Sequence, residues 1–160
     1  MNDTAKNAAN DSNDLVLTRT FDAPREKVFK AWTTPELLKQ WFAPRPFTTP
    51  IVELDLRAGG SNYFVMRDAD GNDYPNHGVY LEIVENEKIV FTDAYTAGWK
   101  PSEKPFFTGV ITFEDVGGKT KYTAVARHWR EEDRKTHEEM GFHEGWGQCA
   151  DQLTELLAKI

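Results

Sequence analysis

The hydrophobic pattern of the chain is most regular at its C-terminal end, over residues 130–160. Apolar side chains recur there at steps of three or four positions and share an arc of about 100°, the width of a core-facing stripe on an α-helix. This spacing predicts one long helix. Its stripe consists of Phe142, Trp146, Cys149, Leu153, Leu156, Leu157 and Ile160.

Three glycines, Gly141, Gly145 and Gly147, interrupt this predicted helix. Each destabilises a helix interior by roughly 1 kcal/mol relative to alanine. A helix that retains them needs either a close backbone approach or open space beside it, which is the first indication of a cavity. The alternative is that the segment breaks at the glycines into two helices.

The pattern at the N-terminal end predicts a tail, a strand and two short helices. Residues 1–13 have no aromatic side chain and are rich in Asn, Asp and Ala, which is typical of a disordered tail. Alternation over Asp14–Phe21 predicts a strand. Helix-start signals, each with a proline close to an acidic residue, follow at 22–26 and 34–36. The first helix should end near Trp32, and the second should carry Leu37, Leu38, Trp41 and Phe42.

Between residues 51 and 129 the signals are those of strands and turns. Turns separate six segments of strand-like composition, and each turn contains glycine except the one at Glu85–Glu87. Successive hairpins predict a mostly antiparallel sheet, which has seven strands with the first one included and is curved enough to wrap the C-terminal helix. The expected fold class is α+β, with a single domain over residues 14–160. The six segments are residues 51–56, 62–67, 74–84, 88–95, 106–115 and 119–129.

Length and charge restrict the classes of function. A chain of 160 residues forms one domain that buries about 70% of the surface its unfolded state exposes. The net charge of −7 argues against nucleic acid or an anionic membrane as a partner. No segment is long enough for membrane insertion and no signal-peptide pattern opens the chain, so a soluble, cytoplasmic protein is expected. The single cysteine, Cys149, excludes an internal disulfide.

Six short stretches occur in an order that resembles a known family. They are FDAP at 21–24, AWTTPE at 31–36, WFAP at 41–44, DLRAGG at 55–60, IVFT at 89–92 and MGFHEGW at 140–146. With them the chain resembles the homologues of the activator of heat-shock protein 90 ATPase, within the START and Bet v 1-like (SRPBCC) superfamily. The resemblance implies a helix-grip fold, in which a curved sheet wraps a long C-terminal helix and a cavity lies between the two.

No motif in the sequence indicates a metal site or a cofactor. His137 and His143 are six positions apart, about 240° around a helix, so they cannot share a metal ion. His77 and His128 stand alone on strand patterns and are expected to be hydrogen-bonded strand residues. Nucleophile-elbow, phosphate-loop and dinucleotide-binding motifs are absent from the sequence, so no cofactor is expected.

Two aspartates lie on predicted strands. Asp55 and Arg57 share the face opposite the apolar residues, which predicts an exposed ion pair that contributes little to stability. Asp93 instead shares a face with Ile89 and Phe91. A carboxylate on an apolar face is paired, has a raised pKa, or lies where the strand has reached solvent. Asp93 is therefore the weak candidate for a catalytic group.

The predicted helix and sheet suggest the lining of a cavity. Beside its apolar stripe the helix carries smaller or more adaptable side chains, and methionine is common at permissive binding surfaces. Aromatic side chains of the sheet and of the second short helix would form the other walls. The alternative is that these side chains meet and fill the space as packed core. The candidate ligand-binding residues are Trp41, Phe42, Phe64, Met66, Phe91, Tyr95, Trp129, Met140, His143 and Gly147.

Two functions of different classes fit such a cavity. The first is binding of a small hydrophobic or amphipathic molecule, as a carrier, a sensor or a stress-related factor. The second, which the superfamily resemblance allows, is a cyclase- or hydrolase-type enzyme; binding is favoured because no general base is evident. The family resemblance also implies a chaperone partner, which is least expected because the eukaryotic activators carry a further N-terminal domain for which 160 residues leave no room. The sequence leaves open whether the chain forms a homodimer.

Overall fold

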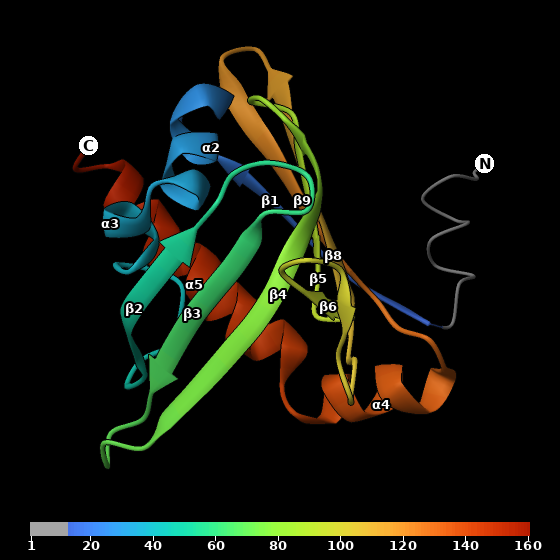
Figure 1. The fold of residues 1–160 in the computed structure, drawn as a ribbon. Helices are drawn as coiled ribbons and strands as arrows, with labels where there is room; N and C mark the ends of the chain where they lie inside the picture. Colours follow the sequence, from blue (N-terminus) through green and yellow to red (C-terminus); the bar gives the residue numbers. More distant parts are fainter. Residues whose placement is uncertain (1–12) are drawn as a thin grey trace.

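The computed structural model describes residues 13–160 (Figure 1). The predicted tail, apart from Asn13, lies outside the described residues. The strands are β1 (Asp14–Phe21), β2 (Thr48–Leu54), β3 (Ser61–Arg67), β4 (Asp73–Val84), β5 (Lys88–Thr92), β6 (Tyr95–Thr96), β7 (Lys100–Pro101), β8 (Thr108–Val116) and β9 (Lys119–Arg127). The helices are α2 (Arg25–Thr33), α3 (Pro35–Leu38), α4 (Glu131–Glu139) and α5 (Phe142–Leu157).

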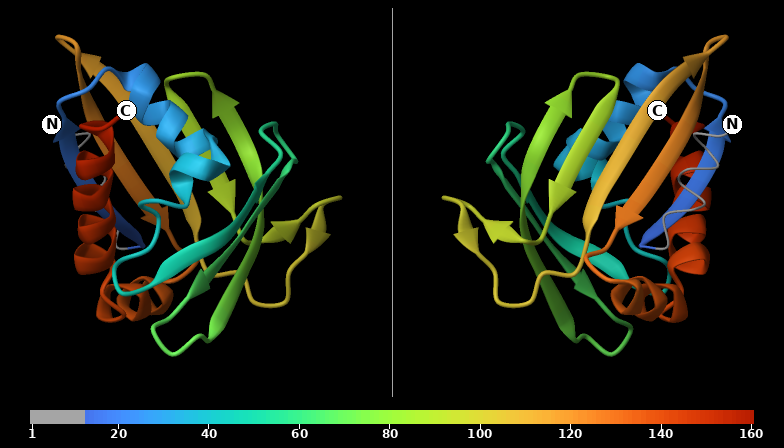
Figure 2. Two further views of the ribbon diagram at one scale, coloured as in Figure 1. Left: turned by 90° about the vertical axis from the view of Figure 1, so that its left-hand side faces the viewer. Right: turned by 90° about the vertical axis from the view of Figure 1, so that its right-hand side faces the viewer.

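Seven strands form one antiparallel sheet in the order β1-β9-β8-β5-β4-β3-β2, and β6 pairs with β7 in a small separate hairpin. The large sheet curves around the helices (Figure 2). Helix α5 contacts β1 and α2, α2 contacts β8 and β9, and α3 contacts β2. This is the α+β helix-grip architecture expected from the sequence. No helix within residues 13–160 is both long and apolar enough to cross a membrane.

The prediction of one continuous C-terminal helix is wrong. The chain breaks into two helices, as the alternative had it, but only at Gly141, the first of the three glycines. Helix α4 ends at Glu139 and α5 begins at Phe142. Gly141 between them has a φ of 96°, a left-handed conformation that glycine adopts without a steric penalty. Gly145 and Gly147 both remain inside α5. Ile160, the last residue of the predicted stripe, lies beyond the end of α5 and is 45% exposed.

Several predicted boundaries differ from those observed. The second short helix ends at Leu38, so Trp41 and Phe42 follow it rather than lie on it, although both are buried. Strand β2 ends at Leu54, which leaves Asp55 and Leu56 beyond the strand. Strand β5 ends at Thr92, and the next residues turn into the β6–β7 hairpin.

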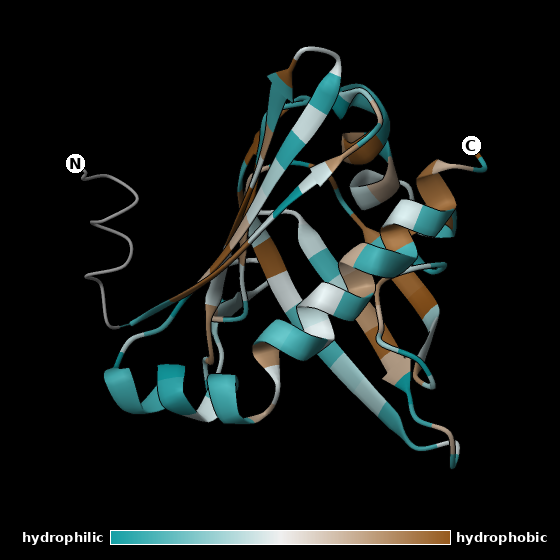
Figure 3. Cartoon of the chain, turned by 180° about the vertical axis from the view of Figure 1, so that it is seen from behind, coloured by the Kyte–Doolittle hydropathy of each residue, from teal (hydrophilic) through white to brown (hydrophobic). Residues whose placement is uncertain are grey.

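The main core lies between α2, the second half of α5 and the sheet. Val28, Ile111 and Leu153, one from each of these layers, are fully buried. Trp41 fills the space beside α2 and donates its indole N–H to the carbonyl oxygen of Ala31 over 3.1 Å. Figure 3 shows the contrast between the two C-terminal helices, since α4 is almost wholly hydrophilic whereas α5 carries hydrophobic bands. The apolar face of α5 is what the sheet wraps.

Candidate functional site

A mostly apolar cavity of about 250 Å³ lies between β3, β5 and the junction of α4 with α5. Aromatic side chains form most of its wall, and Gly145 on α5 leaves an opening in the helix surface. A cavity of this size is slightly smaller than the range of about 300–1,000 Å³ that is typical of ligand-binding pockets. Its lining consists of Phe42, Pro44, Phe64, Met66, Asn76, Phe91, Phe107, His137, Met140, Gly141, Phe142, Gly145, Trp146 and Cys149.

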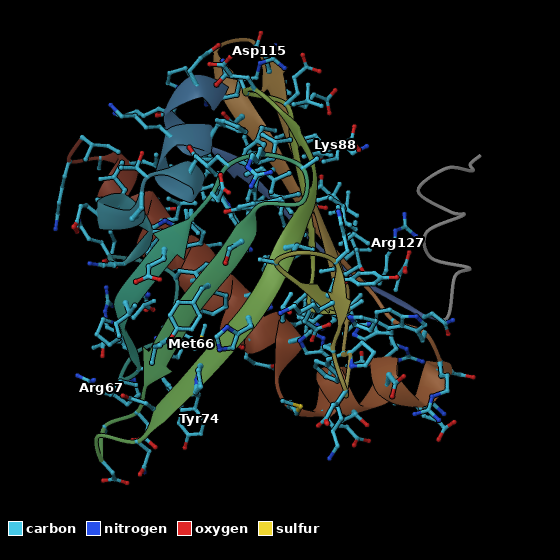
Figure 4. All side chains as sticks on the ribbon, in the orientation of Figure 1. Met66, Arg67, Tyr74, Lys88, Asp115 and Arg127 are labelled. Atoms are coloured by element: carbon cyan, nitrogen blue, oxygen red, sulfur yellow. The ribbon has the colours of Figure 1, made fainter. Side chains whose placement is uncertain are left out.

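Five of the ten ligand-binding candidates line this cavity together. Phe64 and Met66 lie two positions apart on β3 and therefore share one face of the sheet. Figure 4 shows Met66 near the end of β3. Phe91 comes from β5, and its ring lies across Gly109 on the neighbouring strand β8, where any added Cβ would collide with it. The five candidates at the cavity are Phe42, Phe64, Met66, Phe91 and Met140.

The other five candidates lie elsewhere. Trp41 belongs to the packed core, with 1% of its surface exposed. Tyr95 lies on β6, where its ring contacts Trp99 edge-on. Trp129 is 51% exposed and borders a separate shallow hollow at the end of β9, and His143 is exposed on α5. Their binding role remains a prediction without support from their positions.

Gly147, the fifth of these, points away from the cavity. Its carbonyl oxygen accepts a hydrogen bond from Arg19 Nη2 over 3.3 Å, and an added Cβ would lie 3.2 Å from the same nitrogen. Gly147 therefore faces β1. An added Cβ at Gly145 would meet nothing within 4 Å. Two positions along a helix correspond to about 200° of rotation, so the two glycines face opposite sides.

The apolar stripe of α5 is itself a wall of the cavity, which the hydrophobic pattern alone does not predict. Phe142, Trp146 and Cys149 were assigned to the core contact, yet all three line the cavity. Trp146 is only partly buried, although its ring lies near those of Trp32, Phe42, Phe107 and Phe142. Burial raises the pKa of the Cys149 thiol to about 12, so it stays protonated and unreactive near neutral pH.

A second, more polar hollow of about 270 Å³ adjoins the first. The two hollows share the side chains of Phe64, Asn76, Phe91 and Phe107 as walls. The polar residues that line the second hollow and not the first are Asn62, His77, Asp93, Ser102 and Lys104, together with Thr92. The arrangement offers an apolar chamber and a polar one side by side, which is suited to an amphipathic molecule.

Asp93, the weak catalytic candidate, is engaged in backbone hydrogen bonds. Both of its carboxylate oxygens accept the backbone N–H of Phe106, over 2.8 and 3.0 Å, and one also accepts that of Phe107 over 3.3 Å. Burial raises the pKa of Asp93, although these hydrogen bonds act in the opposite direction. The observed geometry makes Asp93 a residue that positions the loop carrying Phe107 at the cavity wall.

The remaining chemical candidates do not form a further site. Asp55 and Arg57 make the exposed ion pair expected from the sequence, with 2.9 Å between Oδ2 and Nε. His77 on β4 stacks on the ring of Tyr63. Within residues 13–160 no three His, Cys, Asp or Glu side chains come together in a way that could hold a metal ion.

His128 and His137 form a buried pair at the edge of the cavity. His128 directly follows β9, one residue beyond the strand on which it was predicted, and it is hydrogen-bonded as expected. Its Nε2 lies 2.9 Å from Nδ1 of His137, near the end of α4. Burial, and secondarily the charge of His128, lower the pKa of His137 to about 4. His137 is therefore a neutral imidazole on the cavity wall at physiological pH.

Known structures with this fold include close relatives of the chain. A crystal structure of a protein from Nitrosomonas europaea is 42% identical over 93% of this chain and 96% of that one, with a TM-score of 0.90. A crystal structure from Mycobacterium smegmatis is 27% identical over 92% and 91% of the two chains, with a TM-score of 0.78. A solution structure from Staphylococcus epidermidis is 29% identical over 92% and 90%, also with a TM-score of 0.78.

A search of curated proteins finds no match to this chain. The model of one protein family, described as activator of Hsp90 ATPase homolog 1-like protein, matches residues 22–158. The match covers the chain from the end of β1 to the end of α5, and it agrees with the resemblance seen in the short sequence stretches. The chain belongs to the activator of Hsp90 ATPase homolog 1-like protein family.

Proposed function

We propose that this protein binds a small hydrophobic or amphipathic molecule in the cavity between the sheet and the first half of α5. The observation that carries the proposal is the open space beside Gly145, in a helix whose second half is fully packed. Glycine destabilises a helix interior relative to alanine, so its presence at an open wall is more consistent with a functional space than with optimised packing.

The size and chemistry of the cavity support a ligand with a ring-sized apolar body. An engineered apolar cavity of about 150 Å³ is known to bind benzene. The present cavity, at about 250 Å³, therefore accommodates a larger ring system. The adjoining hollow, with Asp93, Ser102 and Lys104 on its wall, supplies polar contacts for a head group. Carrier, sensor and stress-related roles would all use this same binding step.

Filling the cavity tests the proposal. Gly145→Leu would direct a side chain into the open space, where its Cβ meets no atom within 4 Å, so the variant should fold at least as stably as wild type and lose binding. The neutral fluorescent probe N-phenyl-1-naphthylamine, titrated into each protein, measures binding, and a urea midpoint measures folding. Thr154→Leu is the matched control, because it adds the same side chain to the exposed face of α5.

The outcomes separate a pocket from a solid core. Loss of probe binding in Gly145→Leu alone supports the cavity as the site. Equal binding in both variants would mean that the probe binds elsewhere, and destabilisation of Gly145→Leu by about 1–3 kcal/mol would indicate overpacking of a core. Absence of probe binding to wild type would contradict the proposed function directly.

A co-chaperone role is the second candidate, and the family match is what favours it. Such a role would use the outer surface of the protein, so Gly145→Leu should leave it unchanged. Measuring the ATPase rate of a heat-shock protein 90 with and without this protein tests it. Asp93 does not support the enzyme alternative, because both of its carboxylate oxygens already accept hydrogen bonds from backbone amides.

A further inference from the structure

A chain of hydrogen bonds runs from the N-terminal end of β1 to the cavity wall. The backbone carbonyl oxygen of Asn13 lies 2.8 Å from Nδ1 of His128, and Nε2 of His128 lies 2.9 Å from Nδ1 of His137. Both imidazoles are buried, with 7% and 8% of their surfaces exposed. The start of β1 is therefore linked through two histidines, nine residues apart, to the cavity wall.

The direction of these hydrogen bonds follows from the carbonyl group. A carbonyl oxygen can only accept, so Nδ1 of His128 carries the proton and donates. In a neutral imidazole the other nitrogen is then an acceptor, so Nε2 of His128 accepts from Nδ1 of His137. His137 consequently carries its proton on Nδ1. Its Nε2 is left unprotonated, with a free lone pair.

We place the free nitrogen on the cavity side of the ring, because His137 lines the cavity and its Nε2, which has no partner in the described part of the chain, is not fully buried. His137 lines the cavity, whereas His128 does not. The two ring nitrogens point in different directions, and Nδ1 is directed at His128. Nε2 has no hydrogen-bond partner among residues 13–160. The low pKa of His137, about 4, keeps the ring neutral and preserves the acceptor near pH 7.

We propose that Nε2 of His137 is a hydrogen-bond acceptor for the ligand, so the preferred ligand carries a hydroxyl or N–H group on a ring-sized apolar body. This inference rests on the proposed function of the cavity. The rings of Phe106, Phe107 and Phe142 surround the imidazole, with centroids 4.8, 5.0 and 5.2 Å away. In such apolar surroundings a ligand that leaves Nε2 without a partner loses affinity.

Asn76 is the competing polar group on the same wall. Its amide nitrogen donates to the backbone carbonyl of Tyr74 over 2.9 Å, which leaves its side-chain oxygen as a second acceptor. Asn76 is exposed, whereas His137 is buried and held by His128. An acceptor on a buried, oriented ring discriminates between ligands more strongly than one on an exposed side chain, because water competes less for it.

A pair of isomers tests the preference without a change in ligand composition. 6-Methyl-2-naphthol carries a hydroxyl donor, whereas 2-methoxynaphthalene has none. Wild type should bind the naphthol roughly 3- to 10-fold more tightly, the range expected for one net hydrogen bond. In His137→Phe the two affinities should become equal, with that for 2-methoxynaphthalene within about twofold of wild type. Titrations followed by amide chemical shifts of the labelled protein measure both affinities and report whether each variant is folded.

Two further measurements keep the inference testable if His137→Phe fails to fold. A long-range proton–nitrogen NMR spectrum of wild type should show the proton of His137 on Nδ1, and the naphthol should shift the Nε2 resonance while 2-methoxynaphthalene does not. In His128→Phe the tautomer is no longer fixed, so the preference for the naphthol should fall. Asn76→Leu removes the competing acceptor from the cavity wall, so it should change the affinities for both isomers alike and leave their ratio as in wild type.

The results distinguish failure of this inference from failure of the proposed function. If neither isomer binds wild type, the cavity is not a binding site for such molecules and the proposed function fails. If both bind equally well, the cavity binds ligands but His137 does not select them. A preference that disappears in Asn76→Leu and survives in His137→Phe would assign the contact to Asn76 and overturn the inference.

Discussion

The two halves of α5 carry one continuous apolar stripe, yet one half faces packed core and the other faces a cavity. In the second half Leu153 is fully buried, and Gln152 is 4% exposed with its amide donating to the carbonyl oxygens of Trp41 and Ala43 over 3.0 and 2.8 Å. In the first half Trp146 is partly buried and Gly145 borders open space. Hydrophobic periodicity therefore identifies the inward side of a helix without revealing what that side meets.

The difference comes from the segments that cover each half. The chain after α3 returns over the second half, and Gln152 fixes it there through three backbone groups, with Arg45 N–H as the third at 3.2 Å. The first half begins at Gly141, where the chain turns sharply away from α4. The wall opposite this half is formed by rings from β3, β5 and the loop before β8, which border the cavity.

The largest expected effect comes from the packed half. Leu153→Ala removes a fully buried side chain, so it should lower the free energy of unfolding by about 3–5 kcal/mol through lost burial and a new cavity. Trp146→Ala should lower it by less than the full value for a buried aromatic, because Trp146 already borders a cavity. Urea denaturation of both variants makes the comparison, and equal or reversed losses would mean that the two halves are packed alike.

The next prediction concerns the hydrogen bonds by which Gln152 holds the segment after α3 against the second half of α5. Gln152→Met keeps the side-chain volume but leaves the carbonyls of Trp41 and Ala43 without their buried donor, so stability should fall by roughly 2–3 kcal/mol. Gln148→Met, which loses only a 3.4 Å contact to Gln152, should cost less than about 0.5 kcal/mol. Similar losses in both variants would show that Gln152 does not fix the segment.

Lowering the pH should reduce the free energy of unfolding through His137, which lies on the cavity wall. Its pKa is lowered from 6.5 to about 4 in the folded state, so the unfolded chain binds more protons between these values. The resulting stability is fully present above pH 6.5 and is lost as the pH falls through 4. It amounts to about 2 kcal/mol once solvent screening near the cavity is allowed for. Urea midpoints of wild type and His137→Phe between pH 7 and 4 measure it, and parallel curves would contradict it.

The smallest expected effect is a difference in stability between alanine substitutions at the two glycines of α5, Gly145 and Gly147. Gly145→Ala adds a methyl group to open space and should raise stability by about 0.8–1 kcal/mol through helix propensity. In Gly147→Ala the new methyl lies 3.2 Å from Nη2 of Arg19, so the guanidinium must shift and the gain should be reduced or absent. Thermal denaturation of both variants tests this, and equal gains would indicate that both glycines face open space.

Local sequence signals determined much of the fold. The bounds of β1 at Asp14 and Phe21 agree with the predicted ones, because alternation between two faces is a property of consecutive residues. The turns at glycine pairs and the order of the elements were likewise readable, and they sufficed to predict the helix-grip fold. The stripe on α5 was also correct up to Leu157.

Tertiary structure decided where the cavity lies and which groups face it. Gly145 and Gly147 are equivalent in the sequence, and only the rotation of α5 against β1 assigns the open side to Gly145. His137 gave no signal as a cavity residue, because its role depends on His128, which the turn after β9 brings within hydrogen-bonding distance. Periodicity fixes relative positions along one element, whereas the rotation and spacing between elements are set by packing over the whole core.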